Sequence, residues 1–204
     1  RSSDLDLDSR GNLWFGSTDQ GYSVSYIDKS GFDGNRFLTD QFRHKSVVSV
    51  CADQDKRLWI STLNDGLFVY DLNDKTLQEI DLNRLVPDNN VGYIRCSGLF
   101  CDRQGELWLV ITTKFRVLRC RYDGKQLHLL DRLDMVNPIA VSQDDLDRIW
   151  ISSYSQELVR YDKNTRVAEH FMLPGEKRTY APAMLQVSPG RMLAASYDNL
   201  LCEV

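Results

Sequence analysis

The stretch ADQDKRLWISTLNDGLFVYD, from Ala52 to Asp71, decides the fold of this chain. It contains a charged turn, an apolar run with a tryptophan, a polar turn at 63–66, and a second apolar run that closes on Tyr-Asp. Short runs rich in aromatic and β-branched residues and bounded by turn residues are typical of β-strands. We therefore expect two adjacent strands here, joined by the turn that contains Gly66.

Variants of this stretch recur along the chain with a large apolar residue at a fixed place. The segments DSRGNLW, DQDKRLW, DRQGELW and DDLDRIW end at Trp14, Trp59, Trp108 and Trp150, and VSPGRML places Leu193 at the same position. The successive intervals are 45, 49, 42 and 43 residues. A regular period of this length indicates a repeat architecture.

The turn before each anchor has its own chemistry. Four of the units have Asp six residues before the anchor, where a carboxylate can accept hydrogen bonds from the backbone two residues further on. Three units have Gly three residues before the anchor, which supplies a positive φ to a tight hairpin. Lys56 and Asp147 occupy the glycine place in the other two units. Lys56 therefore predicts a different or strained turn.

Each repeat holds about four short strands, including SVVSVCA at 46–52 and TLQEIDL at 76–82. A period of about 45 residues with four strands per unit predicts an all-β fold, a β-propeller. We expect one domain, residues 1–204, with blades at roughly 4–45, 46–92, 93–137, 138–182 and 183–204. The last blade lacks a fourth strand, so we expect a fragment of a larger propeller. The tryptophans are expected to pack on the next blade; the alternative is a sugar-stacking platform.

Composition excludes several classes of protein. The net charge is −4 and the pI about 5.4, whereas a nucleic-acid-binding surface is normally basic. No apolar run approaches the length of a membrane helix, and the opening RSSDLDLDSRG does not resemble a signal peptide. The five cysteines are odd in number and lack Cys-x-x-Cys spacing. We therefore expect buried thiols rather than a disulfide framework or a zinc site.

The phrase VVSVCADQDKRLWISTLNDGLFVYD resembles the two-component regulator propeller repeats. That family's repeat has the approximate form Val-x-x-hydrophobic-x-x-Asp-x-x-Gly-x-Leu-Trp-hydrophobic-Gly-Thr, followed by Gly-Leu-x-x-Tyr-Asp. The second repeat matches it at Val47, Val50, Asp53, Leu58, Trp59, Ile60, Thr62, Gly66, Leu67, Tyr70 and Asp71. The third repeat departs after Trp108, where LVITTKFRVLRCRYD has no Gly-Leu, and the fifth has lost the tryptophan.

The resemblance implies a periplasmic sensor region of a hybrid two-component regulator. In that family the sensor is joined across the inner membrane to a histidine kinase, a receiver and a DNA-binding domain, and many members sense oligosaccharides. None of those other parts is in these residues. The resemblance therefore implies that this chain is a non-catalytic sensor that binds an oligosaccharide, and that its parent protein is anchored in the membrane. It implies no cofactor, no metal and no direct contact with nucleic acid; its partners would be the remaining blades and a second copy.

Two other functions stay open. The first is a propeller that docks another protein through its loops and open blade faces. The second is a metal-dependent propeller lactonase or lyase, which has similar blades but gathers Asp, Glu, Asn and His around a metal. The residues after each tryptophan here are apolar or small, and no nucleophile elbow, phosphate loop or His-Glu-x-x-His is present. His44, His128 and His170 are expected at solvated or half-buried positions.

In a propeller blade the strands are named a to d from the inside outward, and the b–c and d–a connections lie on one face. Loops on a rigid scaffold commonly bind ligands. Amide, carboxylate and guanidinium groups suit sugar hydroxyls, and tyrosine offers a stacking face. Tyr154 and Tyr197 both lie four residues after an anchor and are expected at equivalent places. The candidate ligand-binding residues are Asp19, Gln20, Arg43, Asn64, Asp65, Lys114, Tyr154, Gln156, Tyr180, Tyr197 and Asp198.

Overall fold

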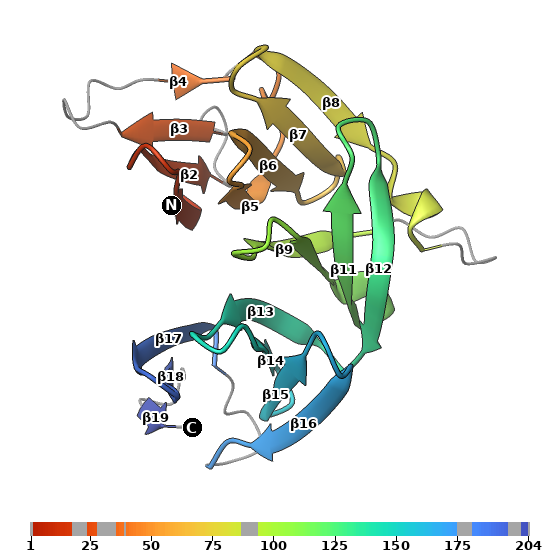
Figure 1. Ribbon diagram of the computed structural model, residues 1–204. Helices are drawn as coiled ribbons and strands as arrows, with labels where there is room; N and C mark the ends of the chain where they lie inside the picture. Colours follow the sequence, from red (N-terminus) through yellow and green to blue (C-terminus); the bar gives the residue numbers. More distant parts are fainter. Residues whose placement is uncertain are drawn as a thin grey trace.

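The structure, a computed structural model, describes residues 2–17, 24–27, 36–38, 40–86, 94–174, 181–195 and 201–203. Five small antiparallel sheets stand around a common axis in an open arc (Figure 1). The first four sheets have four strands each, and the described part of the fifth has three. The prediction of an all-β propeller with an incomplete last blade is confirmed.

Each blade is a meander whose first strand is innermost. Blade one contains β1 (Ser2–Leu7), β2 (Leu13–Ser17), β3 (Val24–Ile27) and β4 (Arg36–Phe37). Blade two contains β5 (Val47–Ala52), β6 (Arg57–Thr62), β7 (Leu67–Asp71) and β8 (Thr76–Ile80), followed by the 3-10 helix η1 (Leu82–Arg84). Blade three contains β9 (Cys96–Cys101), β10 (Leu107–Ile111), the 3-10 helix η2 (Thr112–Lys114), β11 (Arg116–Tyr122) and β12 (Leu127–Asp134). Blade four contains β13 (Pro138–Gln143), β14 (Ile149–Ser153), β15 (Glu157–Asp162) and β16 (Val167–Met172), and blade five contains β17 (Ala183–Ser188), β18 (Arg191–Ala195) and β19 (Leu201–Glu203).

The repeated aspartate fixes both the inner turn and the tryptophan. Asp53 Oδ1 accepts hydrogen bonds from the backbone N–H groups of Asp55 and Arg57, each at 2.9 Å, as the turn chemistry predicted. Its other oxygen, Oδ2, accepts a 3.0 Å bond from the indole Nε1 of Trp59, which was not predicted. The same carboxylate–indole bond recurs at 2.8 to 3.0 Å in the pairs Asp8–Trp14, Asp102–Trp108 and Asp144–Trp150.

The glycine place in the inner turn is left-handed in every blade. Gly11, Gly105 and Gly190 have φ values of 80°, 76° and 73°. Lys56 and Asp147 adopt nearly the same conformation, at 62° and 61°. The strain predicted at Lys56 is therefore confirmed, because a side chain with a Cβ is disfavoured in this region.

The tryptophans pack against the following blade. Trp59 is 1% exposed and meets the ring of Tyr122 in blade three edge to face, with centroids 5.1 Å apart. Trp108 meets Tyr161 of blade four at 6.0 Å. Trp150 lies in a cluster with residues of blade five. The prediction that the tryptophans form the core between blades is confirmed, and each blade depends on its neighbour for burial.

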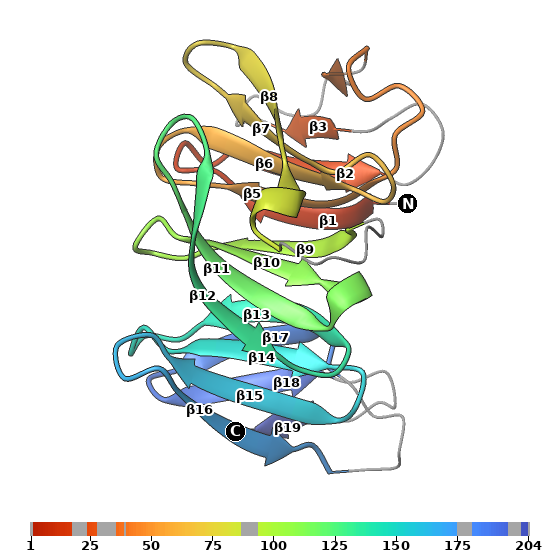
Figure 2. The same ribbon diagram turned by 90° about the vertical axis from the view of Figure 1, so that its right-hand side faces the viewer.

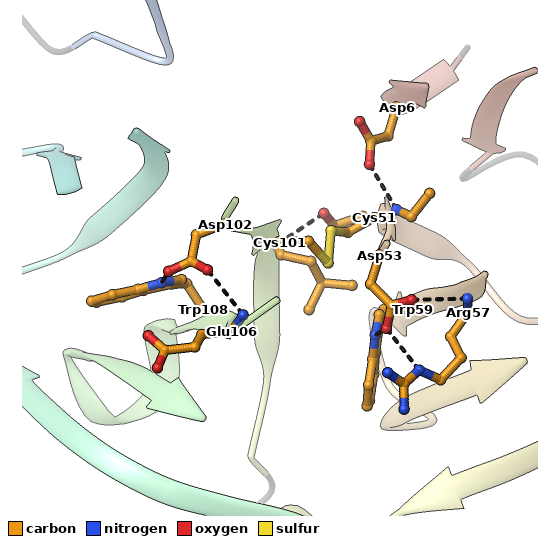
Figure 3. Close-up of a disulfide and its surroundings, with 12 residues drawn as sticks. Asp6, Cys51, Asp53, Arg57, Trp59, Cys101, Asp102, Glu106 and Trp108 are labelled. Atoms are coloured by element: carbon orange, nitrogen blue, oxygen red, sulfur yellow. Dashed lines mark hydrogen bonds and ion pairs between the residues drawn. A yellow bond between two sulfur atoms is a disulfide. The ribbon is translucent and has the colours of Figure 1, made fainter. Parts of the chain in front are cut away.

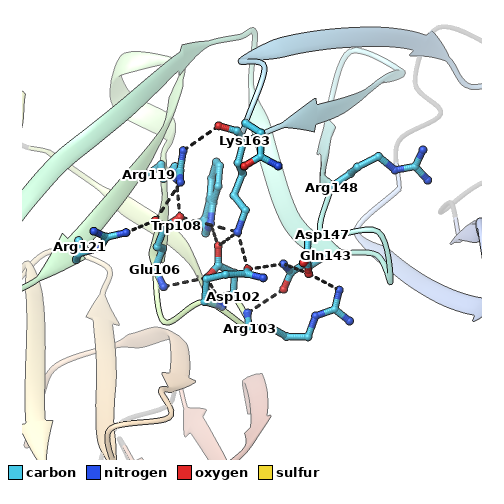
Figure 4. Close-up of polar contacts among 12 residues, drawn as sticks. Asp102, Arg103, Glu106, Trp108, Arg119, Arg121, Gln143, Asp147, Arg148 and Lys163 are labelled. Carbon is cyan, nitrogen blue, oxygen red and sulfur yellow. Dashed lines mark hydrogen bonds and ion pairs between the residues drawn. The ribbon is translucent and has the colours of Figure 1, made fainter.

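In blade three the basic residue that pairs with the aspartate of the inner turn comes from blade four (Figure 4). In blades two and four an arginine four residues after the aspartate, Arg57 or Arg148, pairs with it at 2.9 and 2.7 Å. Glu106 holds that place in blade three, so Lys163 reaches across from blade four to Asp102 Oδ2 at 2.7 Å. The Lys163 side chain is 6% exposed and the Asp102 side chain is fully buried.

Glu106 is itself buried and is neutralised within blade three. Arg119 donates to both carboxylate oxygens of Glu106, at 2.6 and 3.0 Å, and Arg121 donates to one at 2.8 Å. Arg119 also donates to the backbone carbonyl of Lys163 at 3.3 Å. The replacement of the usual arginine by Glu106 is thus compensated by a network of hydrogen bonds and ion pairs that joins blades three and four (Figure 4).

The expectation that all five cysteines are thiols is wrong for two of them. Cys51 of blade two and Cys101 of blade three form a disulfide, with Cα atoms 6.2 Å apart (Figure 3). The two residues lie on the innermost strands, on blade faces that pack against each other. Cys96 and Cys120 are buried thiols in the same cluster, as expected. Burial raises the pKa of each to about 12, so both thiols are protonated at neutral pH.

The Asp144→Asn variant tests how much the hydrogen bond between the carboxylate and the indole stabilises the fold. Burial raises the pKa of Asp144, but hydrogen bonds from Trp150 and Arg148 outweigh it, so the folded pKa lies below the usual value. The stabilisation is therefore present above the unfolded pKa of about 4 and is lost as pH falls through the folded pKa. Near neutral pH we expect a loss of about 1–3 kcal/mol in the free energy of unfolding, measured by urea denaturation.

The matched control is Asp74→Asn, an exposed turn aspartate of blade two. We expect it to change the free energy of unfolding by less than about 0.5 kcal/mol. The difference between Asp144→Asn and the unmodified protein should shrink in acid. A difference that stays constant down to about pH 2 would contradict the assignment.

Thiol counting tests the disulfide. In protein purified and denatured without reductant, we expect three of the five cysteines to react with a thiol reagent, and all five after reduction. Reduction should lower the free energy of unfolding by about 2–4 kcal/mol, because the cross-link restricts the unfolded chain. Five reactive thiols before reduction would show that the cross-link does not form.

Candidate functional site

The innermost strands β1, β5, β9, β13 and β17 stand around the middle of the arc (Figure 1). We call the space between them the central channel, because two hollows are lined by residues of these strands. Side chains tie β1 to β5 and β5 to β9. Asp6 accepts a bond from the backbone N–H of Ala52 at 2.7 Å, and Ser49 Oγ accepts one from Leu99 N–H at 3.0 Å. These bonds satisfy backbone groups that no neighbouring strand pairs, and they hold the channel wall in a fixed curve.

The channel has a hollow at each end. The hollow at the a–b turns, about 470 Å³, is lined by Asp6, the aspartates of three inner turns and the disulfide. The hollow at the other end, about 580 Å³, is lined mainly by small or apolar residues that include Ser49, Ser97 and Ala183. Gly98 belongs to this end, where a Cβ would lie 3.3 Å from the carbonyl oxygen of Ile139. Glycine therefore allows β9 and β13 to approach closely there.

The b–c and d–a connections meet at this second end, on a surface that we call the loop face. Backbone bonds join them within each blade: Leu63 N–H to Ser46 O at 2.8 Å, Thr112 N–H to Arg95 O at 3.2 Å, and Tyr154 N–H to Asn137 O at 2.9 Å. Figure 2 shows the a–b turns on the opposite side. The two sets of loops expected to share one face therefore do so in blades two, three and four.

The predicted residues of blade two are engaged in local structure. The backbone N–H of Asp65 donates to Thr62 Oγ1 at 2.9 Å, and its carboxylate accepts from Lys45 Nζ at 3.2 Å. Asn64 lies in the same turn. Arg43 pairs with Asp40 at 3.2 Å, with both side chains largely exposed. These groups help to shape the loop face.

The predicted residues of blades three and four lie in the b–c connections. Lys114 ends the 3-10 helix η2, and Tyr154 stands 51% exposed in the turn after β14. Gln156 has a φ of 64°, and its carbonyl accepts a 2.9 Å bond from Leu173 N–H. Tyr154 and Gln156 thus share one turn at the loop face.

Five predicted residues lie outside the described residues: Asp19, Gln20, Tyr180, Tyr197 and Asp198. The expected equivalence of Tyr154 and Tyr197 stays a prediction.

Sequence reasoning missed two residues of the loop face. Phe115, which follows Lys114, has a φ of 52° and a side chain 52% exposed. Arg95 lies in the link before β9, and its backbone N–H donates to Thr113 Oγ1 at 3.1 Å. The signal for Phe115 was present, since the third repeat departs from the Gly-Leu pattern at this loop. Nothing in the sequence distinguished Arg95.

The histidines are placed on the surface. His128 bonds Asp123 and His170 bonds Glu157, each at 2.6 Å, and His44 is exposed with a φ of 70°. The bond from His128 holds the pKa of Asp123 well below its usual range. Among the described residues no group of three or more His, Cys, Asp or Glu is arranged to hold a metal ion. None of the described helices is long and apolar enough to cross a membrane.

Comparison with known families supports the resemblance seen in the sequence. Residues 41–64 match the family described as two component regulator propeller. They contain β5 and β6, which are the inner hairpin of blade two. The resemblance to two-component regulator propeller repeats is thereby confirmed at this repeat.

A curated relative and several solved structures extend the comparison. The chain is 25% identical over 170 residues to a Bacillus subtilis protein named "Putative sugar lactone lactonase YvrE"; the match covers 77% of this chain and 57% of that protein. A structure described as "the extracellular domain of the putative hybrid two component system BT3049 from B. thetaiotaomicron" superposes with a TM-score of 0.69 at 15% identity, over 98% of this chain and 26% of that chain. An inactive virginiamycin B lyase from Staphylococcus aureus gives 0.71 at 13% identity, over 99% and 69%. These structural likenesses show the propeller fold.

Proposed function

We propose that this chain is the ligand-sensing propeller of a hybrid two-component regulator. It binds an oligosaccharide at the loop face and signals to a kinase and a DNA-binding part outside these residues. The observation that carries the proposal is the two component regulator propeller repeat at 41–64. The extracellular domains among the similar structures support a sensor outside the cytoplasm, and we propose a periplasmic location.

The loop face supports a sugar ligand through the groups that it exposes. The ring of Tyr154 offers an apolar face for a sugar ring, and the amide of Gln156 in the same turn can bond hydroxyl groups. The backbone bonds of this turn fix both residues on a rigid blade. A preorganised site loses little conformational entropy when a ligand binds.

A second candidate is a propeller lactonase or lyase, which the match to the Bacillus subtilis protein and the lyase superposition favour. Such an enzyme requires a metal and turnover. A third is a docking propeller, favoured by apolar side chains on blade five: Leu185 is 66% exposed and Leu201 is 65% exposed. Further blades or a second copy would cover that face under this proposal.

A thermal-shift screen against plant and host oligosaccharides tests the sensor proposal. We expect the melting temperature to rise with one class of glycan, and the rise to disappear in Tyr154→Ala. The matched control is Leu146→Ala, because Leu146 is 63% exposed at the a–b turn of the same blade, on the opposite side. That variant should respond to the glycan as the unmodified protein does.

Three outcomes separate the candidates. A glycan shift that chelation of metals leaves unchanged supports the sensor. Lactone hydrolysis or streptogramin cleavage that chelation abolishes would replace the sensor with the enzyme. No shift across the panel by well-folded protein would move the assignment to docking.

A further inference from the structure

Arg95 has no acidic partner among the residues that the structure describes. Five other partly buried arginines of the described chain each pair with a carboxylate: Arg57, Arg116, Arg119, Arg148 and Arg160. The guanidinium of Arg95 makes no hydrogen bond or ion pair with the described residues, and its Nε is buried without a partner. A partly buried cation with unmet donors is costly unless an anion meets it.

The position of Arg95 is fixed on the loop face. Its backbone N–H donates to Thr113 Oγ1 at 3.1 Å, and its carbonyl accepts from Thr112 N–H at 3.2 Å. Both threonines belong to η2, the b–c connection of blade three. The backbone of Arg95 is therefore held beside that loop, and the residue that follows the loop's 3-10 helix is Phe115.

Phe115 is held in a strained conformation with its ring exposed. Its equivalent in blade four is Gln156, because the carbonyl of each accepts a 2.9 Å bond from the residue after its outer strand, Met135 or Leu173. In blade two the residue that precedes the third strand is Gly66, with a φ of 93°. A bulky side chain at φ 52° is unfavourable, and such strain is concentrated at functional sites.

A short link joins Phe115 to Tyr154. Met135 bonds the carbonyl of Phe115, Asn137 bonds the N–H of Tyr154, and only Val136 separates them in the chain. Two residue steps span at most about 7 Å, so the two exposed rings flank one short segment. Val136 between them is 58% exposed. This part of the loop face thus carries two exposed aromatic side chains with an exposed valine between them, and Arg95 is anchored at the adjoining loop.

We propose that this surface binds an oligosaccharide that carries an acidic group. The guanidinium of Arg95 pairs with a carboxylate or sulfate of the ligand, and the rings of Phe115 and Tyr154 stack on sugar rings. A planar guanidinium suits either oxyanion. The chain has a net charge of −4, so an acidic ligand needs a local cation to be held. This inference rests on the proposed function and adds to it the class of sugar.

Calorimetric titration with four probes tests the proposal. Oligogalacturonides carry carboxylates only, sulfated galactan oligosaccharides carry sulfates only, and xylo- and manno-oligosaccharides are neutral. We expect one acidic probe to bind, more weakly at high salt, and the neutral probes not to bind. Arg95→Gln should weaken that binding at least about tenfold without lowering the melting temperature, because the charge it removes has no partner. The control Arg191→Gln removes an arginine that pairs with Glu203 directly after the a–b turn of blade five, on the opposite side, and should bind normally.

A second pair of variants separates binding from folding. Phe115→Gly relieves the strained φ, so we expect a higher melting temperature together with weaker binding. Lys56→Gly relieves a similar φ of 62° at an a–b turn on the opposite side and should raise the melting temperature while binding stays unchanged. Loss of stability in Phe115→Gly would show that the ring serves packing, and would overturn its assigned role.

The failures are distinguishable. If a neutral probe binds and Arg95→Gln binds it equally well, the acidic site is wrong and the sugar sensor stands. If none of the probes, nor any glycan of the wider panel, binds folded protein, the sensor proposal itself falls.

Discussion

The hydrogen bond from each tryptophan indole to an aspartate six residues earlier is the constraint on which the rest of the propeller depends. One carboxylate oxygen closes the inner turn and the other orients the indole, so turn geometry and blade packing are set by a single side chain. The oriented ring is then buried against the next blade. The residues of the inner turn thus also determine how neighbouring blades pack. Because every blade needs this packing, the stretch at 52–71 recurs along the chain.

The fold was predictable because its determinants are local: strand-forming runs, turn residues and a regular period. The contacts between blades were less predictable from the sequence, and the disulfide illustrates why. Cys51 lies two residues before its aspartate and Cys101 one residue before its own, so they point to opposite faces of their blades and meet between them. The odd number of cysteines pointed away from this pairing, while register along the inner strands would have indicated it.

The candidate site was predictable as a face and less so as a set of residues. Loops on one side of a propeller follow from the meander, and Lys114, Tyr154 and Gln156 were placed there from the repeat alignment. Arg95 was missed because its significance is that its guanidinium pairs with none of the described carboxylates, which only the three-dimensional structure shows. Phe115 was missed because the sequence shows that the loop has lost its glycine, but not that the residue in its place adopts a positive φ.

The lysine that crosses from blade four to Asp102 has a consequence for unfolding. In a stack of repeats, cooperativity is set by the energy of each boundary relative to the stability of each unit. Blades two and four supply their own arginine to the turn, whereas blade three borrows its cation, so it is not self-contained. The disulfide joins blade three to blade two on its other side. We therefore expect blades two, three and four to unfold together as one cooperative unit rather than one by one.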